Sequence, residues 1–208
     1  MVYYSQSKQD EFVAQFLNFK TDGYFLDIGA HDGILSSNTL FFEKELGWSG
    51  ICVEPNSEIF SELSMNRYVK CLNLAISDID GFIKFDGFNC TDIGYDVPCM
   101  RFDTMLNKYN VPNTIDYMSI DIEGHEFIAL KDFPFDNYIV RAMTIEHNLY
   151  ANGSELKDSI YYLLSNNGYT RYRENALCLD KNPEWYLKPY EDWYVHTEFL
   201  EEIKLWTF

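Results

Sequence analysis

The sequence predicts an α/β fold of the Rossmann-like type, in which helices flank a mainly parallel central sheet. Short apolar runs alternate with amphipathic stretches of about 10–15 residues, as expected of repeated βαβ units. Glycine or proline closes many of these segments, and acidic residues repeatedly follow the apolar runs. Ligands bind beyond the carboxyl ends of the strands in such sheets, so these acids mark the candidate site.

The first half of the chain predicts three strands and two helices. The apolar run GYFLDIGA is closed by glycine, and SGICVEPN is stopped by proline, so both are expected to be strands. The helix between them is expected to open with Ser36 as its cap and to end at Gly47. In chain order the predictions are a strand at 23–30, a helix at 36–47, a strand at 49–56, a helix at 57–67 that opens with a serine cap, and a strand at 69–77.

The second half continues the alternation after one additional strand or hairpin arm at 81–88. The run IDYMSIDIEG reads as a buried strand that ends in carboxylates. In chain order we predict a helix at 103–111, a strand at 115–124, a helix at 125–133, a strand at 140–148, a helix at 154–168 and strand-like stretches at 169–180.

The length of 208 residues fits a single domain, with residues 181–208 as an aromatic-rich C-terminal extension. The apolar runs are too short to span a bilayer, and the N-terminus lacks the pattern of a signal peptide. The five cysteines form no CxxC pair, so we expect a reduced, cytoplasmic protein without membrane attachment. The extension is expected to pack on the sheet or to form a homodimer contact rather than to bind carbohydrate.

The charge balance narrows the class of ligand. Acidic residues number 33 and basic residues 16, which gives a net charge of −17. A nucleic-acid binder needs a basic face, so this balance argues against that class. It remains compatible with a neutral or cationic small ligand.

Two strand ends in the first half indicate a nucleotide-like cofactor. Asp27 begins the sequence DIGAHDG, whose glycines follow a GxxxG pattern rather than the GxGxxG of a nicotinamide site. An acid at that position repels a pyrophosphate and suits a cation. Glu54 ends the second strand, where a carboxylate can accept both hydroxyls of a ribose.

Five segments, taken in order, resemble the FkbM family of S-adenosylmethionine-dependent methyltransferases: YFLDIGAHDG, SNTLFFEKELGWSGICVEPN, NLAISD, DYMSIDIEGHE and TIEHN. The resemblance extends from about residue 5 to about residue 169. It implies a class I Rossmann-like fold and methyl transfer to a hydroxyl of a small molecule, sugar or glycan.

The resemblance also implies where the cofactor lies. Asp27 and its loop would follow the methionine part, Glu54 would hold the ribose, and Asp78 or a nearby amide would read the adenine. Ser36 would contact the methionine carboxylate at a helix N-terminus, or would simply cap the helix. The expected cofactor-binding residues are Asp27, Gly29, Ala30, Ser36, Asn38, Glu54, Pro55, Asn56, Ile76, Ser77, Asp78 and Asp121.

Four residues at two neighbouring strand ends are the catalytic candidates: Asp121, Glu123, Glu146 and His147. Transfer to a hydroxyl requires orientation of the acceptor and removal of its proton. In the favoured interpretation, His147 or a carboxylate with a raised pKa is the general base. In the alternative, Asp121 and Glu146, with Glu123 as a further ligand, hold Mg²⁺.

Two other functions remain open at this level. A nicotinamide-dependent oxidoreductase could use the same architecture, although the missing GxGxxG pattern disfavours it. A ligand-binding or assembly protein without catalytic activity could have kept the fold. The set of Asp121, Glu146 and His147 argues against that second alternative.

Overall fold

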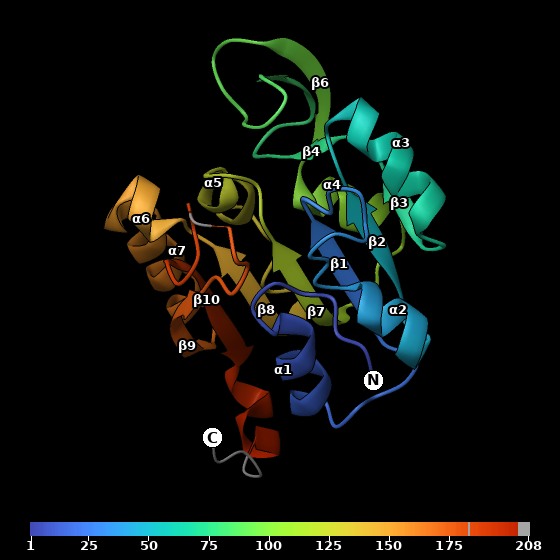
Figure 1. Ribbon diagram of the computed structural model, residues 1–208, viewed down its shortest axis with the longest axis vertical. Coiled ribbons are helices and arrows are strands. Elements are labelled where there is room, and N and C mark those ends of the chain that lie inside the picture. Colours follow the sequence, from blue (N-terminus) through green and yellow to red (C-terminus); the bar gives the residue numbers. More distant parts are fainter. Residues whose placement is uncertain (183, 204–208) are drawn as a thin grey trace.

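A seven-stranded sheet forms the centre of the computed structural model, which describes residues 1–182 and 184–203. The strand order is β3-β2-β1-β7-β8-β10-β9. Five neighbouring strands are parallel: β3 (Lys70–Leu72), β2 (Ser49–Val53), β1 (Tyr24–Ile28), β7 (Thr114–Ile120) and β8 (Ile139–Glu146). The predicted α/β fold with a mainly parallel sheet is therefore confirmed (Figure 1).

The last strand along the chain lies inside the sheet. β10 (Pro189–His196) is antiparallel to both of its neighbours, β8 and β9 (Tyr169–Leu177). The sequence treats this segment as an extension, whereas its side chains from Tyr190 to Val195 are buried in the sheet. Residues 183 and 204–208 of the predicted extension lie outside the described part of the chain.

A second sheet of three strands stands beside the first, in the order β4-β6-β5. It consists of β4 (Ala75–Ile76), β5 (Gly81–Phe85) and β6 (Tyr95–Met100). The single strand predicted at 69–77 is thus wrong, because β3 and β4 belong to different sheets. Asn73 lies at the break, where its side-chain amide donates to the carbonyl oxygens of Glu54 and Pro55 at 2.9 and 3.1 Å.

Helices cover both faces of the large sheet and give two hydrophobic cores. The side chains of α1 (Gln9–Phe16), α2 (Leu40–Leu46) and α3 (Ser57–Asn66) pack on one face. Those of α4 (Phe102–Lys108), α5 (Glu126–Leu130) and α7 (Ser154–Asn166) pack on the other face. Two short elements complete the fold, α6 (Leu149–Asn152) and the 3₁₀ helix η1 (Thr197–Ile203).

The two cores follow from the alternation of side chains along each strand. In β1, Leu26 and Ile28 belong to the core under α4, α5 and α7, whereas Phe25 belongs to the core under α1 and α2. Strands buried on both faces read as continuous apolar runs, which is why the sequence pattern located them.

Two of the predicted helix caps are wrong by a few residues. The helix predicted from Ser36 begins at Leu40, and Ser37 instead accepts from the amides of Thr39 and Leu40 at 3.4 and 3.2 Å. The cap of α3 is Asn56, which accepts from the amides of Glu58 and Ile59. Residues that can cap a helix lie close together at the start of each of these helices. The sequence alone does not show which of them accepts from the first free amides of the helix.

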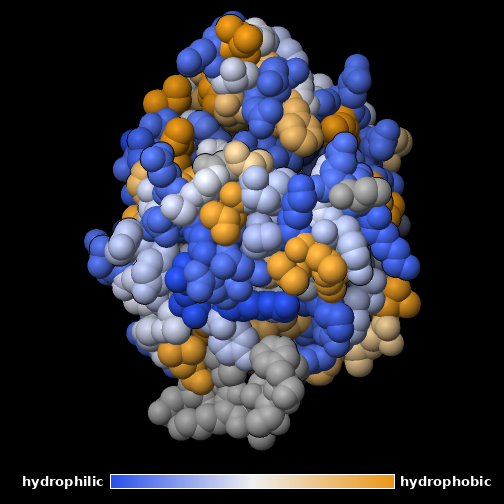
Figure 2. Space-filling model, turned by 60° about the vertical axis from the view of Figure 1, so that its left-hand side comes forward, coloured by the Kyte–Doolittle hydropathy of each residue, from blue (hydrophilic) through white to orange (hydrophobic). Residues whose placement is uncertain are grey.

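The face of the molecule seen in Figure 2 is predominantly hydrophilic. Figure 2 shows hydrophobic residues scattered among hydrophilic ones on the face in view, with several near the end of the molecule that carries the β5–β6 hairpin. Exposed hydrophobic side chains on and beside this hairpin include those of Ile79, Phe82, Phe88 and Ile93. Within the described residues, no helix combines the length and the apolar character needed to cross a membrane.

Candidate active site

A cavity of about 470 Å³ opens at the carboxyl ends of the parallel strands. Gly29 follows β1, Glu54 follows β2, Asp121 follows β7, and Glu146 is the last residue of β8; all four line the cavity. This is the edge of the sheet at which a parallel α/β fold binds its ligands. The β5–β6 hairpin, the loop before α2 and the segment that leads into β10 contribute further walls.

The loop after β1 passes very close to the end of β7. Gly29 has a φ of +88°, and a Cβ there would collide with the backbone carbonyl of Asp121. The amides of Gly29 and Ala30 both donate to the carbonyl oxygen of Val53 at 3.0 Å. Glycine is required at this position because only glycine allows the close approach and the left-handed backbone together.

Backbone amides on both sides hold the Glu54 carboxylate in place. One oxygen accepts from the amide of His31 at 3.1 Å and the other from the amide of Asn56 at 2.8 Å. Burial raises the pKa of Glu54, and these two hydrogen bonds oppose that shift. The carboxylate is therefore fixed on the cavity wall, where each oxygen can accept a further hydrogen bond from a ligand.

Asp27 is tied to the loop that carries the other predicted methionine contacts. Its carboxylate accepts from the Thr39 hydroxyl at 2.6 Å and lies 4.0 Å from the buried guanidinium of Arg67. Burial raises the pKa of Asp27, and the charge of Arg67 opposes the shift. On the same loop Asn38 donates to the hydroxyl of Ser119 at 2.8 Å, while its Oδ1 is buried without a partner.

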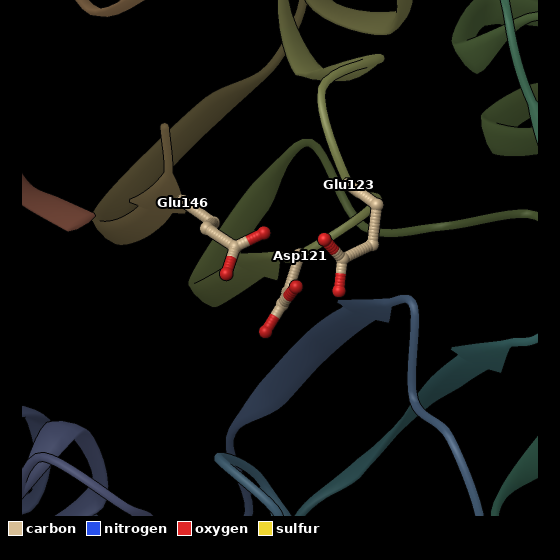
Figure 3. A group of neighbouring side chains, drawn as sticks. All are labelled: Asp121, Glu123 and Glu146. Atoms are coloured by element: carbon tan, nitrogen blue, oxygen red, sulfur yellow. The ribbon is translucent and has the colours of Figure 1, made fainter. Parts of the chain in front are cut away.

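Three carboxylates meet at the ends of β7 and β8. One oxygen from each of Asp121, Glu123 and Glu146 lies within 4.8 Å of the other two (Figure 3). Asp121 continues the ladder of β7, since its amide donates to the carbonyl of Ile28 at 2.9 Å. Figure 3 shows the three carboxylate groups turned toward a common space above the end of β1.

Burial raises the pKa of all three acids, and repulsion from neighbouring carboxylates adds to this shift for Glu123 and Glu146. Burial is the main cause for each; the pKa of Glu123 rises to about 7, and that of Glu146 rises well above its ordinary value. A hydrogen bond between Glu146 and Asp121 raises the pKa of the former and lowers that of the latter. Three like charges this close are stable only if protons or a cation are shared among them.

Glu126 holds the turn that presents Glu123. It is fully buried, and its Oε1 accepts from the amides of Ile122 and Gly124 at 3.0 and 3.1 Å. Its pKa is raised to about 7, mainly by burial. Glu123 has a φ of +55°, which directs the chain back toward the cavity after the strand. Glu126 is the first residue of α5, so the same side chain begins the helix and closes this turn.

His147 is buried outside the cavity. Its Nε2 lies 3.2 Å from Oδ1 of the buried Asp192, and its Nδ1 accepts from the amide of Leu149 at 3.2 Å. It is 2% exposed and is not among the residues that line the cavity. The expectation that His147 joins Asp121 and Glu146 in one constellation is therefore wrong, because Asp192 of β10 and the Leu149 amide of α6 engage its two ring nitrogens outside the cavity.

Most of the predicted cofactor residues line the cavity, and three do not. Asn56 caps α3, Ser77 lies 3.0 Å from Nε2 of His125, and Asp78 pairs with Lys131 at 2.8 Å. Ser36 reaches the cavity from an irregular loop, so it is not placed at a helix N-terminus. The residues that do reach it are Asp27, Gly29, Ala30, Ser36, Asn38, Glu54, Pro55, Ile76 and Asp121.

Sequence reasoning missed a second group of lining residues. Phe85 and Phe88 come from the β5–β6 hairpin, Tyr150 comes from α6, and Trp185 and Tyr190 come from the segment before β10 and from β10 itself. Aromatic enrichment of the tail was visible in the sequence, but nothing there indicated that the tail returns to the carboxyl edge of the sheet.

Comparison with known proteins identifies one matching family and several solved structures with a similar fold. A methyltransferase FkbM domain matches residues 27–171. No curated protein is significantly similar to the chain in sequence. The FkbM methyltransferase from Methylobacillus flagellatus KT has a TM-score of 0.55 and 15% identity, over 85% of this chain and 44% of that protein. The chain thus spans less than half the length of that relative.

Two other solved structures share the architecture. A protein from Klebsiella pneumoniae that is provisionally called an O-methyltransferase has a TM-score of 0.59 and 8% identity, over 94% of this chain and 83% of that one. Fibrillarin from Aeropyrum pernix, solved with natively bound S-adenosyl-L-methionine, has a TM-score of 0.50 and 13% identity, over 85% and 67%. At these identities the likeness shows the fold alone.

Proposed function

The chain belongs to the FkbM methyltransferase family, and from this premise we propose that it transfers the methyl group of S-adenosylmethionine to a hydroxyl of a small molecule, sugar or glycan. One observation carries the proposal. A single cavity contains both Glu54, the carboxylate expected to bind a ribose, and the carboxylates of Asp121 and Glu146. Donor and acceptor can therefore meet in one space of the required size.

The cavity suggests an orientation for the cofactor. Glu54 accepts the ribose hydroxyls, the apolar wall at Leu74, Ala75 and Ile76 takes the adenine, and the loop at Asn38 faces the methionine part. S-adenosylmethionine carries a sulfonium and an ammonium against one carboxylate, so an acidic cavity attracts it more strongly than its neutral-sulfur product. The sulfonium methyl would then lie toward Asp121.

The reaction is a displacement at carbon. The acceptor oxygen forms a bond to the methyl carbon, the carbon–sulfur bond breaks, and its electron pair returns to sulfur. The hydroxyl proton must go to an acceptor near the methyl group. Asp121, Glu123 and Glu146 are the candidates, either as direct bases or through Mg²⁺ bound between them.

Two features of the cavity support a carbohydrate acceptor. Trp185 and Tyr150 line the cavity, and aromatic side chains of this kind can stack on a sugar ring. No lysine or arginine lines the cavity within the described residues, and the net charge is −17, so an RNA or other phosphate-rich acceptor is disfavoured. The five unpaired cysteines support a cytoplasmic setting. We propose no membrane partner. A homodimer is compatible with the proposed methyl transfer.

Calorimetry and a turnover assay test the proposal. We expect S-adenosylhomocysteine, and not NADH, to bind at a 1:1 ratio. With S-adenosylmethionine present, a panel of sugars should include one that stimulates release of S-adenosylhomocysteine. Preferential binding of NADH would favour the oxidoreductase alternative. Cofactor binding without turnover across hydroxyl, amine and thiol acceptors would favour a non-catalytic protein.

A further inference from the structure

We propose that Asp121, Glu123 and Glu146 form a site for one hard divalent cation of the Mg²⁺ or Mn²⁺ type, with Glu123 as the third protein ligand. The catalytic role of this site rests on the proposed methyl transfer, in which the ion would bind the acceptor hydroxyl. Its existence can be tested without any methyl transfer.

The distances between the carboxylates suit such an ion. The three oxygens lie within 4.8 Å of one another. An octahedral Mg²⁺ with bonds of about 2.1 Å places adjacent oxygens about 3 Å apart and opposite oxygens about 4.2 Å apart. Small rotations of the side chains therefore bring all three onto one ion, and the remaining positions stay open to water or to an acceptor hydroxyl.

The electrostatics of the cluster favour a positive partner. Among the described residues, no lysine, arginine or histidine forms an ion pair with any of the three carboxylates. The side-chain donor seen at the cluster is the Asn148 amide, 3.3 Å from Oε2 of Glu123. The charge of His31 opposes the rise that burial causes in the pKa of Asp121. A divalent ion would offset the repulsion among all three carboxylates.

An unpartnered oxygen points to the ligand independently of the clustering. Glu146 is 6% exposed, and its Oε2 is buried with no hydrogen-bond partner. Buried carboxylate oxygens without a partner are rare, because the lost hydration costs about 1–3 kcal/mol or more. Figure 3 shows the Glu146 carboxylate directed from the end of β8 toward Asp121, where the ion would lie.

Backbone hydrogen bonds also fix the positions of two of the three carboxylate residues. Asp121 is fixed by the ladder between β7 and β1, and Glu123 by the turn that closes on Glu126. Anchoring of this kind orients metal ligands before the ion arrives. A bound cation would coordinate the acceptor oxygen and make its proton easier to remove.

Binding of Mn²⁺ to the cofactor-free protein, followed by electron paramagnetic resonance and calorimetry, tests the site. We expect one Mn²⁺ per chain, displaced by Mg²⁺, and a higher melting temperature when the ion is present. Glu123→Gln and Glu146→Gln should each weaken the affinity at least tenfold and abolish the thermal shift. Both variants should fold, because each removes a repelling charge. Asp180→Asn, which changes an acid in the same cavity wall outside the cluster, should leave the affinity within about twofold.

Two outcomes would overturn the inference. One is the absence of saturable Mn²⁺ binding in the wild type. The other is a loss of affinity in Asp180→Asn that equals the loss in the cluster variants, because the ion would then respond to the general acidity of the cavity. If S-adenosylhomocysteine still binds while Mn²⁺ does not, the metal site fails and the proposed function stands. If Mn²⁺ binds and no cofactor does, the reverse holds.

Discussion

Glu54 is the residue on which cofactor recognition depends most in this account. Its carboxylate reaches the cavity already fixed by the amides of His31 and Asn56. The strand-end position made it predictable from the sequence. Its fixation was not predictable, because it depends on two loops whose conformations no periodicity reveals.

Replacing Glu54 by alanine should raise the dissociation constant for S-adenosylhomocysteine about 10- to 100-fold, since two charge-assisted hydrogen bonds to the ribose are lost. Calorimetry measures this change. The matched control is Glu58→Ala, an exposed acid on the first turn of α3. Equal affinities in the wild type and in a folded Glu54→Ala protein would contradict the assignment.

His147 shows that a residue type alone does not predict a catalytic role when the orientation of the side chain is unknown. A histidine at the end of a strand is a reasonable base, but the chain turns after Glu146 and buries the ring against Asp192. The partner comes from β10, more than forty residues later in the chain. No local pattern connects the two.

His147→Ala should therefore lower the free energy of unfolding by about 1–3 kcal/mol, because the buried Asp192 loses one of its partners and keeps those to Arg171 and Asn175, while kcat falls less than tenfold. Urea denaturation and steady-state rates provide the two readouts. A loss of kcat by about 10²–10⁴-fold with unchanged stability would instead identify His147 as the base.

Among the elements, β10 has the largest consequences for the site. It separates β8 from β9, and the chain that leads into it brings Trp185 and Tyr190 to the cavity. The sequence did not show it as a strand, because aromatic residues and acids interrupt the alternation that marks one. The parallel strands were found readily, since their continuous apolar runs reflect burial on both faces.

Trp193 in β10 should act through stability and not through acceptor binding. It is 1% exposed and stacks on Phe12 at 4.6 Å, and the Arg173 guanidinium covers its ring at 4.5 Å. Trp193→Ala should lower the free energy of unfolding by about 3–5 kcal/mol and leave cofactor affinity unchanged in the folded fraction. Tyr162→Ala, at an exposed aromatic residue on α7, is the control. A raised acceptor KM without destabilisation would contradict this role.

At the scale of the whole molecule, the sequence gives the amount of negative charge but not its location. The net charge of −17 includes the acids that line the carboxyl edge of the sheet, where the cavity lacks lysine and arginine among the described residues. That distribution arises only when strands far apart in the sequence become neighbours. The concentration of negative charge at this edge of the sheet would attract both the cationic cofactor and the inferred metal ion.

The central claim is that one cavity brings the methyl donor to the carboxylates of β7 and β8. The most direct test is a crystal structure of the protein with S-adenosylhomocysteine bound. We expect the ribose hydroxyls to lie on the Glu54 carboxylate and the cofactor sulfur to be directed toward Asp121 and Glu146. Their carboxylates should lie within about 6 Å of the methyl position, the reach of a proton acceptor acting through one water molecule. A cofactor bound elsewhere, or one whose sulfur points away from both acids, would contradict the account.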